Sequence, residues 1–147
     1  MTEKRIIRFL KKHHVLTVCT TVNNEPWCAN CFYVYMEDSN TLVFTSDNDT
    51  RHGREFLINK EVAGTVVPET KIIGKIRGIQ FRGTVSLLQG DDLEKARRAY
   101  IKRFPPAMLM DTTLWAIDLS YIKMTDNRLG FGKKLIWEKN PRQTEKP

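Results

Sequence analysis

The chain has 147 residues, which is the usual length of one domain. A chain of this size buries about 70% of the surface that its unfolded form exposes, so a core can form without disulfides or a structural metal. Hydrophobic residues make up 41% of the sequence and charged residues 28%, which excludes a disordered or collagen-like chain. The longest apolar stretch, residues 31–36, is far shorter than the roughly 20 residues of a membrane helix, so we expect no membrane association.

The formal net charge is +7, which favours an anionic partner such as a phosphorylated ligand or nucleic acid. The basic residues are spread along the chain, however, and no aromatic–basic repeat of an RNA-recognition module is present. We therefore interpret them as solvated, and we do not expect a nucleic-acid partner. Three cysteines are too few for a disulfide framework, and the first residues do not form an export signal, so we expect free thiols in the cytoplasm.

Hydrophobic periodicity predicts three helices and seven strands. Helices are predicted where apolar residues recur every three to four positions, over residues 2–14, 51–58 and 91–104. Their expected N-terminal caps are Thr2, one of residues 47–50, and Asp91. Strands are predicted where apolar residues alternate, over residues 15–22, 27–36, 41–46, 61–67, 75–88, 114–123 and 129–138.

The strands are joined by short polar turns instead of regular crossover helices, which argues against a doubly wound parallel sheet. The longest predicted strand contains or adjoins three glycines, Gly74, Gly78 and Gly83, which would let it bend as the strands of a small closed barrel must. The pattern therefore predicts an α+β fold built on an antiparallel barrel. We expect a single domain over residues 1–139 and a polar tail over residues 140–147.

Two cysteines, Cys28 and Cys31, have the two-residue gap of redox and zinc motifs. A second pair at metal-ligand spacing is missing, and residues three apart on a regular strand face opposite sides of the sheet. We therefore expect these two cysteines to have a structural role, unless a bulge brings their side chains together.

The segment from Leu42 to Arg54 is more informative about function. A predicted strand ends in Thr45 and Ser46, a polar turn follows, and a helix begins with Arg51 and His52. Backbone N–H groups at a helix start, together with a guanidinium, suit a phosphate dianion. The alternative is an ordinary capped turn with solvated cations.

The stretches Leu42–Ser46 and Arg51–Glu55 resemble the segment that holds the phosphate of flavin mononucleotide (FMN) in the pyridoxamine 5′-phosphate oxidase-like split barrels. The resemblance extends over residues 2–138 and is closest to the small YhbP-type proteins of that superfamily. It implies a six- to seven-stranded antiparallel split β-barrel with three flanking helices. It also implies a homodimer that holds two flavins between its subunits.

The resemblance assigns candidate roles to nine residues. Those implied at the phosphate are Thr45, Ser46, Arg51 and His52. Those implied along the isoalloxazine ring are Asn30, Cys31 and Phe32, with Gln80 or Arg82 reaching the flavin from the long strand.

Two departures from the family pattern limit the expected activity. Pyridoxamine phosphate oxidases place an arginine and a lysine on the second strand, where residues 30–36 of this chain contain no cation. They also carry an Arg-Leu-His signature near the end, where residues 130–135 here read Gly-Phe-Gly-Lys-Lys-Leu. We therefore expect a flavin-dependent oxidoreductase of unknown substrate and no oxidation of vitamin B6 phosphates. The alternative is a non-enzymatic split barrel that binds haem, another small anionic ligand or a protein at its dimer cleft.

Overall fold

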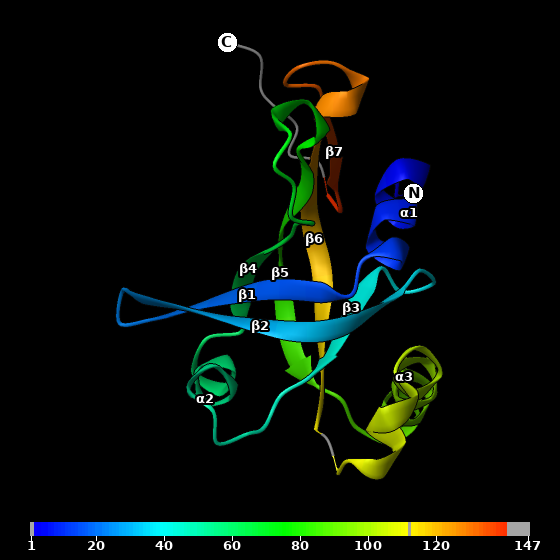
Figure 1. The fold of residues 1–147 in the computed structure, drawn as a ribbon. Helices are drawn as coiled ribbons and strands as arrows, with labels where there is room; N and C mark the ends of the chain where they lie inside the picture. The colour runs from blue at the N-terminus through cyan, green and yellow to red at the C-terminus, as the bar shows by residue number, and fades with distance from the viewer. Residues whose placement is uncertain (1, 112, 141–147) are drawn as a thin grey trace.

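The fold is an antiparallel β-barrel with three flanking helices, described here from a computed structural model for residues 2–111 and 113–140 (Figure 1). The helices are α1 (Lys4–Lys12), α2 (Arg51–Ile58) and α3 (Gly90–Arg103). The strands are β1 (Val15–Val22), β2 (Glu25–Met36), β3 (Thr41–Thr45), β4 (Glu61–Val66), β5 (Arg77–Leu87), β6 (Leu114–Asp126) and β7 (Lys134–Glu138). Short 3₁₀ turns cover η1 (Ile73–Lys75), η2 (Pro105–Leu109) and η3 (Asn127–Leu129).

All strand pairings are antiparallel, in the order β3-β2-β1-β4-β5-β6-β7. An additional pairing of β3 with β6, from Thr41 opposite Asp118 to Thr45 opposite Leu114, closes six strands into a ring. The strand β7 pairs with the second half of β6 and extends beyond the ring. The α+β class and the six- to seven-stranded antiparallel barrel predicted from the sequence are therefore confirmed.

The pairing of the long strand β5 with β6 shifts register between Arg82 and Gly83. A Cβ atom on Gly83 would lie 2.5 Å from the backbone oxygen of Asp118, so only glycine permits this approach. The expected bend of the long strand thus has a physical cause at Gly83. By contrast, Gly74 lies in η1, outside the strand.

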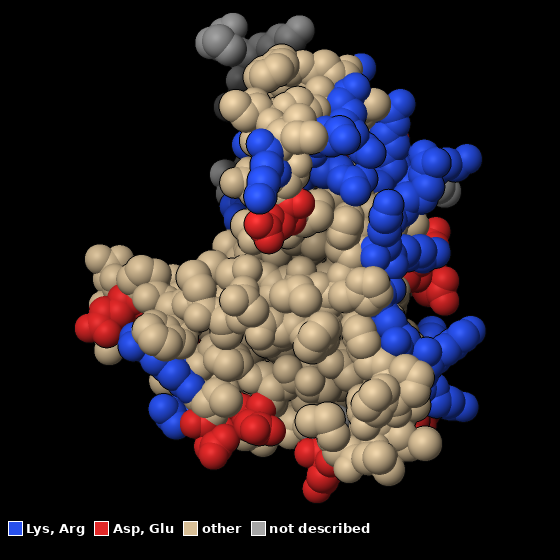
Figure 2. All heavy atoms as spheres, in the orientation of Figure 1, with Lys and Arg blue, Asp and Glu red and all other residues tan. Residues whose placement is uncertain are grey.

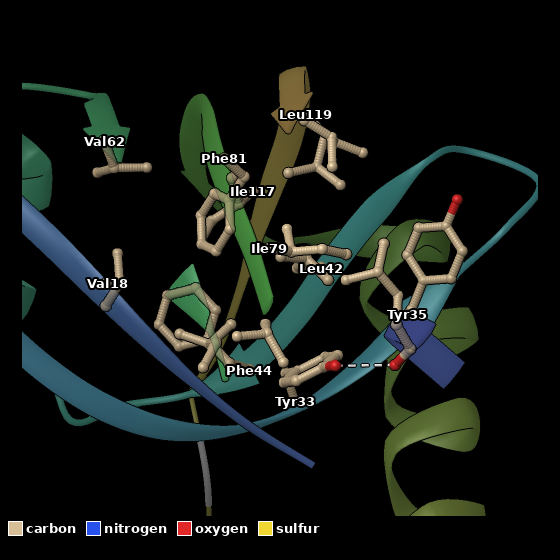
Figure 3. Close-up of a cluster of buried hydrophobic side chains, with 14 of the residues drawn as sticks. Val18, Tyr33, Tyr35, Leu42, Phe44, Val62, Ile79, Phe81, Ile117 and Leu119 are labelled. Atoms are coloured by element: carbon tan, nitrogen blue, oxygen red, sulfur yellow. Dashed lines mark hydrogen bonds between the residues drawn. The ribbon is translucent and has the colours of Figure 1, made fainter. Parts of the chain in front are cut away.

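The barrel interior holds the main hydrophobic core, shown in part in Figure 3. Inward side chains such as Val18, Phe44 and Ile117 are almost completely buried. The helix α1 packs against this core, and the Tyr33 hydroxyl donates a 2.8 Å hydrogen bond to the backbone oxygen of Leu10, drawn as a dashed line in Figure 3. A smaller cluster lies outside the ring between α3, β3 and β6 and contains Val43, Ala96, Tyr100, Ala107, Leu114 and Ala116.

Two of the predicted helix caps are wrong. Glu3 caps α1 in place of Thr2, since its carboxylate accepts from the Arg5 and Ile6 N–H groups. Asp91 lies inside the first turn of α3, whose N-cap position is Gln89. The cap of α2 is Thr50, which lies within the range expected.

Strand ends also differ from the prediction. The first turn contains only residues 23–24, so β2 begins at Glu25. The strand β6 continues to Asp126, where a turn was predicted, and β7 begins only at Lys134. Of the predicted polar tail, residues 141–147 lie outside the described residues.

Lysine and arginine side chains gather on the side of the molecule where α1 lies (Figure 2). The exposed basic residues of this helix are Lys4, Arg5, Arg8, Lys11 and Lys12. This basic surface is remote from α2, which lies at the opposite end of the barrel in Figure 1. Within the described part of the chain, every helix is too short or too polar to cross a bilayer.

Candidate functional site

The segment between β3 and α2 forms a tight polar turn. The Thr50 hydroxyl caps the helix by accepting from the Gly53 N–H at 3.0 Å, and it donates to the backbone oxygen of Asp47 at 2.8 Å. The Trp115 indole N–H donates to the backbone oxygen of Ser46 at 3.0 Å and fixes the end of β3 against β6. The start of α2 is therefore held in one position relative to the barrel.

Two hydroxyls and one imidazole meet at this turn. The His52 Nε2 atom is hydrogen bonded to the Ser46 hydroxyl and lies 3.3 Å from the Thr50 hydroxyl. Burial lowers the pKa of His52 below its ordinary value, so the ring is neutral at pH 7. This cluster offers hydrogen bonds to an anion but no positive charge.

The positive charge at the start of α2 comes from Arg51, whose side chain is 40% exposed. Its Nε donates to the Glu55 carboxylate at 2.9 Å, and its guanidinium lies 4.4 Å above the Trp27 ring. A second carboxylate, that of Glu25, lies 3.5 Å from the guanidinium. The arginine is thus held in place, and an incoming anion has to compete with two carboxylates for its charge.

Thr45 lies on the other side of the same turn. Its hydroxyl is 3.3 Å from the Tyr100 hydroxyl of α3, which also donates to the backbone oxygen of Phe32 at 3.4 Å. This tyrosine therefore connects the end of β3 to β2. The Phe32 ring itself is 58% exposed and packs against Phe104 at 5.4 Å.

Three of the remaining candidates, Asn30, Gln80 and Arg82, lie on the outer face of the sheet. In the register, Asn30 is opposite Thr17, Thr17 opposite Thr65, and Thr65 opposite Gln80, so Asn30 and Gln80 share one face. They are three strand spacings apart, or about 14 Å. The neighbouring Arg82 places its guanidinium 5.0 Å from the Tyr121 ring.

Cys31 is separated from this group because it points into the barrel, where it belongs to the core. Burial raises the pKa of its thiol to about 11. The structure thus places Asn30 and Phe32 on the outer face and the residue between them on the inner face.

The functional prediction from sequence did not include Glu55, Trp27 or Tyr100. The spacing of Arg51 and Glu55, four residues apart on a predicted helix, is a sequence signal for an ion pair. No comparable signal exists for Trp27 or Tyr100, because strand pairing and helix packing bring them to the turn. Among the described residues, no three histidine, cysteine or acidic side chains come together as a metal site.

Comparisons with known proteins agree with this architecture. The chain is 48% identical over 134 residues to a UPF0306 protein of Yersinia pseudotuberculosis, covering 91% of each chain. It is 45% identical over 134 residues to a UPF0306 protein of Photorhabdus laumondii, covering 91% of this chain and 94% of that one.

Solved structures share the fold at low sequence identity. A heme binding protein from Mycobacterium smegmatis superposes with a TM-score of 0.73 at 17% identity, covering 88% of this chain and 55% of that chain. An FAD binding protein from the same organism gives a TM-score of 0.69 at 18% identity, covering 85% and 95% of the two chains. These likenesses show the fold alone.

A family model described as pyridoxamine 5′-phosphate oxidase matches residues 2–126. This match covers most of the chain and includes the barrel strands β1 to β6 and the turn before α2. The chain therefore belongs to the pyridoxamine 5′-phosphate oxidase family and, within it, to the UPF0306 proteins.

Proposed function

We propose that this protein binds FMN between two copies of the chain and acts as a flavin-dependent oxidoreductase. The observation that carries the proposal is the polar cluster at the start of α2, where Ser46, Thr50 and His52 meet. Membership of the pyridoxamine 5′-phosphate oxidase family also supports the proposal, as does the presence of an FAD binding protein among the structural neighbours.

The phosphate of the flavin would bind at the turn between β3 and α2. The Ser46 hydroxyl and the His52 ring are the hydrogen-bonding groups there, and the helix start adds favourable backbone dipoles. Thr45, whose hydroxyl faces Tyr100 on the other side of the turn, would have to turn toward the phosphate to join them. Arg51 supplies the charge, because Glu25 is an exposed carboxylate that can release it at little cost. These residues fit a phosphate dianion.

The ring of the flavin would lie along the outer face of β2, beside Asn30 and Phe32, with Cys31 behind them in the core. Gln80 and Arg82 on β5 would reach it from the same face or from the second copy. Two exposed apolar side chains that are paired on this face, Val15 and Phe32, favour a covering partner, and we propose that a second copy of the chain supplies it. The bound flavin would supply electron or hydride transfer, while the protein orients it and excludes water.

The test is a titration of the purified protein with FMN, followed by visible absorption, flavin fluorescence and the shift in melting temperature. We expect Arg51→Ala to weaken FMN binding at least about tenfold, because one charge-assisted hydrogen bond contributes about 1.5–3 kcal/mol. The control is Arg54→Ala, which removes a neighbouring exposed cation of the same helix. The size of the protein in solution should remain that of a dimer in both variants.

Equal affinity for FMN in the wild type and in Arg51→Ala would refute the role of Arg51. Absence of any spectral change or melting shift on adding FMN to the wild type would refute flavin binding itself.

A second function is supported by the weak cationic character of the same site. His52 is neutral, the charge of Arg51 is shared with two carboxylates, and β2 carries no lysine or arginine. These features favour a non-enzymatic barrel that binds haem, another small anionic ligand or a protein in the cleft between its subunits. A heme binding protein is among the structural neighbours. Titration with haemin, followed by its visible absorption, separates this candidate from the flavoprotein.

A further inference from the structure

Two cysteine side chains meet on the outer face of the β1–β2 hairpin. Cys19 on β1 is directly opposite Cys28 on β2, and their Sγ atoms are 2.8 Å apart. Cys28 is exposed and Cys19 is partly buried. The spacing in the sequence suggests a pair of Cys28 with Cys31, but in the structure the cysteine that contacts Cys28 is Cys19.

The hairpin turn fixes this pairing. Asn23 and Asn24 both have positive φ angles, 51° and 65°, as in a two-residue turn that matches the twist of its strands. With this turn, Val22 is opposite Glu25, and counting back along both strands brings Cys19 opposite Cys28. A shift of register would turn the side chains of one strand to the other face, so the pair is built into the fold.

The type of strand pair also suits a reversible disulfide. Pro26 has no N–H, so the pair that it forms with Thr21 is of the kind without hydrogen bonds. Pairs with and without hydrogen bonds alternate along an antiparallel ladder. Cys19 and Cys28 are two positions from Thr21 and Pro26, so they are also a pair without hydrogen bonds, with Cα atoms about 4.5 Å apart. Disulfides span Cα separations of roughly 4.4–6.8 Å, so a bond between Cys19 and Cys28 fits this strand pair. A disulfide at the exposed Cys28 is also open to reducing thiols, and exposed disulfides are among the readily reduced ones.

A metal site explains the pair less well. A structural zinc ion takes four ligands, whereas the described residues contain no cluster of three or more potential ligands. The third cysteine, Cys31, points into the core on the opposite face of β2. Cys19 lines an open cavity of about 310 Å³ together with Ala63 and Gly64, and Cys28 is exposed, so small molecules can reach both thiols.

We propose that Cys19 and Cys28 form a redox-active dithiol, which low-molecular-weight disulfides oxidise to a cross-strand disulfide. The inference rests on one chain alone and does not depend on flavin or haem binding. The exposed Cys28 thiolate attacks one sulfur of the reagent, forming a mixed disulfide and releasing the first thiol. Cys19 then attacks the Cys28 sulfur, forming the protein disulfide and releasing the second thiol. The protein loses two protons and two electrons, and one reagent disulfide becomes two thiols.

The order of these two attacks follows from the surroundings of the sulfur atoms. Burial and the adjacent Cys28 thiol raise the pKa of Cys19 to about 11, which disfavours its thiolate. Cys28 is the more exposed of the two, so a reagent in solution meets it first.

In the test, the 147-residue protein is equilibrated with mixtures of reduced and oxidised glutathione, and free thiols are then blocked with N-ethylmaleimide in denaturant. Intact mass should change from three adducts in the reduced protein to one adduct in the oxidised protein, because Cys31 stays free. Chymotryptic cleavage after Trp27, which lies between the two cysteines, should leave the two peptides joined only in the oxidised sample.

Three single variants test which cysteines form the disulfide and which of them reacts first with glutathione. Cys31→Ala is the matched control and should oxidise at the same glutathione ratio as the wild type. Cys19→Ser should accumulate a mixed disulfide of Cys28 with glutathione. Cys28→Ser should accumulate much less of the corresponding mixed disulfide on Cys19. The folded protein should form the Cys19–Cys28 bond with an equilibrium constant at least about tenfold above that of the urea-unfolded chain, because folding raises the effective concentration of the two thiols.

Three adducts at every glutathione ratio would overturn the proposal. So would loss of the disulfide in Cys31→Ala, because the bond would then involve Cys31. Equal equilibrium constants in the folded and unfolded chains would show that the fold does not promote the reaction. None of these outcomes depends on bound FMN, so they are distinguishable from failure of the proposed flavin function.

Discussion

Glu55 is a buried carboxylate at the centre of the contacts around α2. It accepts hydrogen bonds from the Thr20 hydroxyl of β1 and from the Arg51 guanidinium. These bonds, first that from Thr20 and then that from Arg51, lower the pKa of Glu55 below its ordinary value of 4.5. The carboxylate therefore joins the helix that carries the candidate phosphate site to the barrel wall.

This arrangement predicts a dependence of stability on pH. A carboxyl group with a lowered pKa in the folded state stabilises the protein above its ordinary pKa, and this stabilisation is lost as pH falls through the folded value. Between roughly pH 7 and pH 3.5, the free energy of unfolding should therefore fall more in the wild type than in Glu55→Gln. Urea unfolding at both pH values measures the difference. Glu69→Gln, in an exposed loop, serves as the control and should behave like the wild type.

At the scale of elements, β4 depends on a close approach to both neighbouring strands. A Cβ atom on Gly64 would lie 2.2 Å from the Thr17 backbone oxygen of β1 and 2.3 Å from the Phe81 ring of β5. The backbone oxygen cannot move without disturbing the pairing of β1 with β4. Glycine at this position thus permits the spacing of three consecutive strands.

We expect Gly64→Ala to reduce the free energy of unfolding by about 1–3 kcal/mol or more, because overpacking against backbone is not easily relieved. Gly74→Ala is the matched control, since its Cβ would meet no atom within 4 Å. That variant should stay within about 0.5 kcal/mol of the wild type. Chemical denaturation measures both. Similar stabilities for the two variants would contradict the close approach at Gly64.

At the scale of the whole molecule, closure of the ring depends on the short strand β3. Its residue Phe44 is fully buried, lies in the core shown in Figure 3, and meets the Phe56 ring of α2 at a centroid distance of 5.8 Å. The same strand pairs with both β2 and β6. Packing of this one side chain therefore supports the barrel and the helix that carries the candidate site.

We expect Phe44→Ala to cost about 3–5 kcal/mol of stability, because it leaves a cavity in the core. Phe44→Leu should cost less and can be used if the alanine variant does not fold. Leu109→Ala is the control, since Leu109 is 89% exposed and its loss should change stability by no more than about 0.5 kcal/mol. Thermal and urea unfolding measure the stability of these three variants against that of the wild type. Equal effects of Phe44→Leu and Leu109→Ala would contradict the role of β3.

Much of the fold could be predicted from the sequence, because local periodicity reports which face of each element is buried. The order of helices and strands is confirmed, as are the bounds of β1 and α2. Caps and strand ends were less predictable. For example, Glu3 caps α1 because its carboxylate reaches two N–H groups, which Thr2 does not do. Such competition between adjacent residues is decided by backbone geometry.

The sequence by itself determined the family, the α+β barrel and the polar segment from Thr45 to His52 as the place to look for an anion. Hydrophobic alternation and helix caps are local, so they can be read along the chain. Only the tertiary structure decided which groups meet at this segment, namely Glu55 and Trp27 against Arg51, and Tyr100 between Thr45 and Phe32. It also decided that Cys19 lies beside Cys28 on the β1–β2 hairpin. These contacts join residues from different elements, and strand register and helix packing bring them together, which local patterns do not encode.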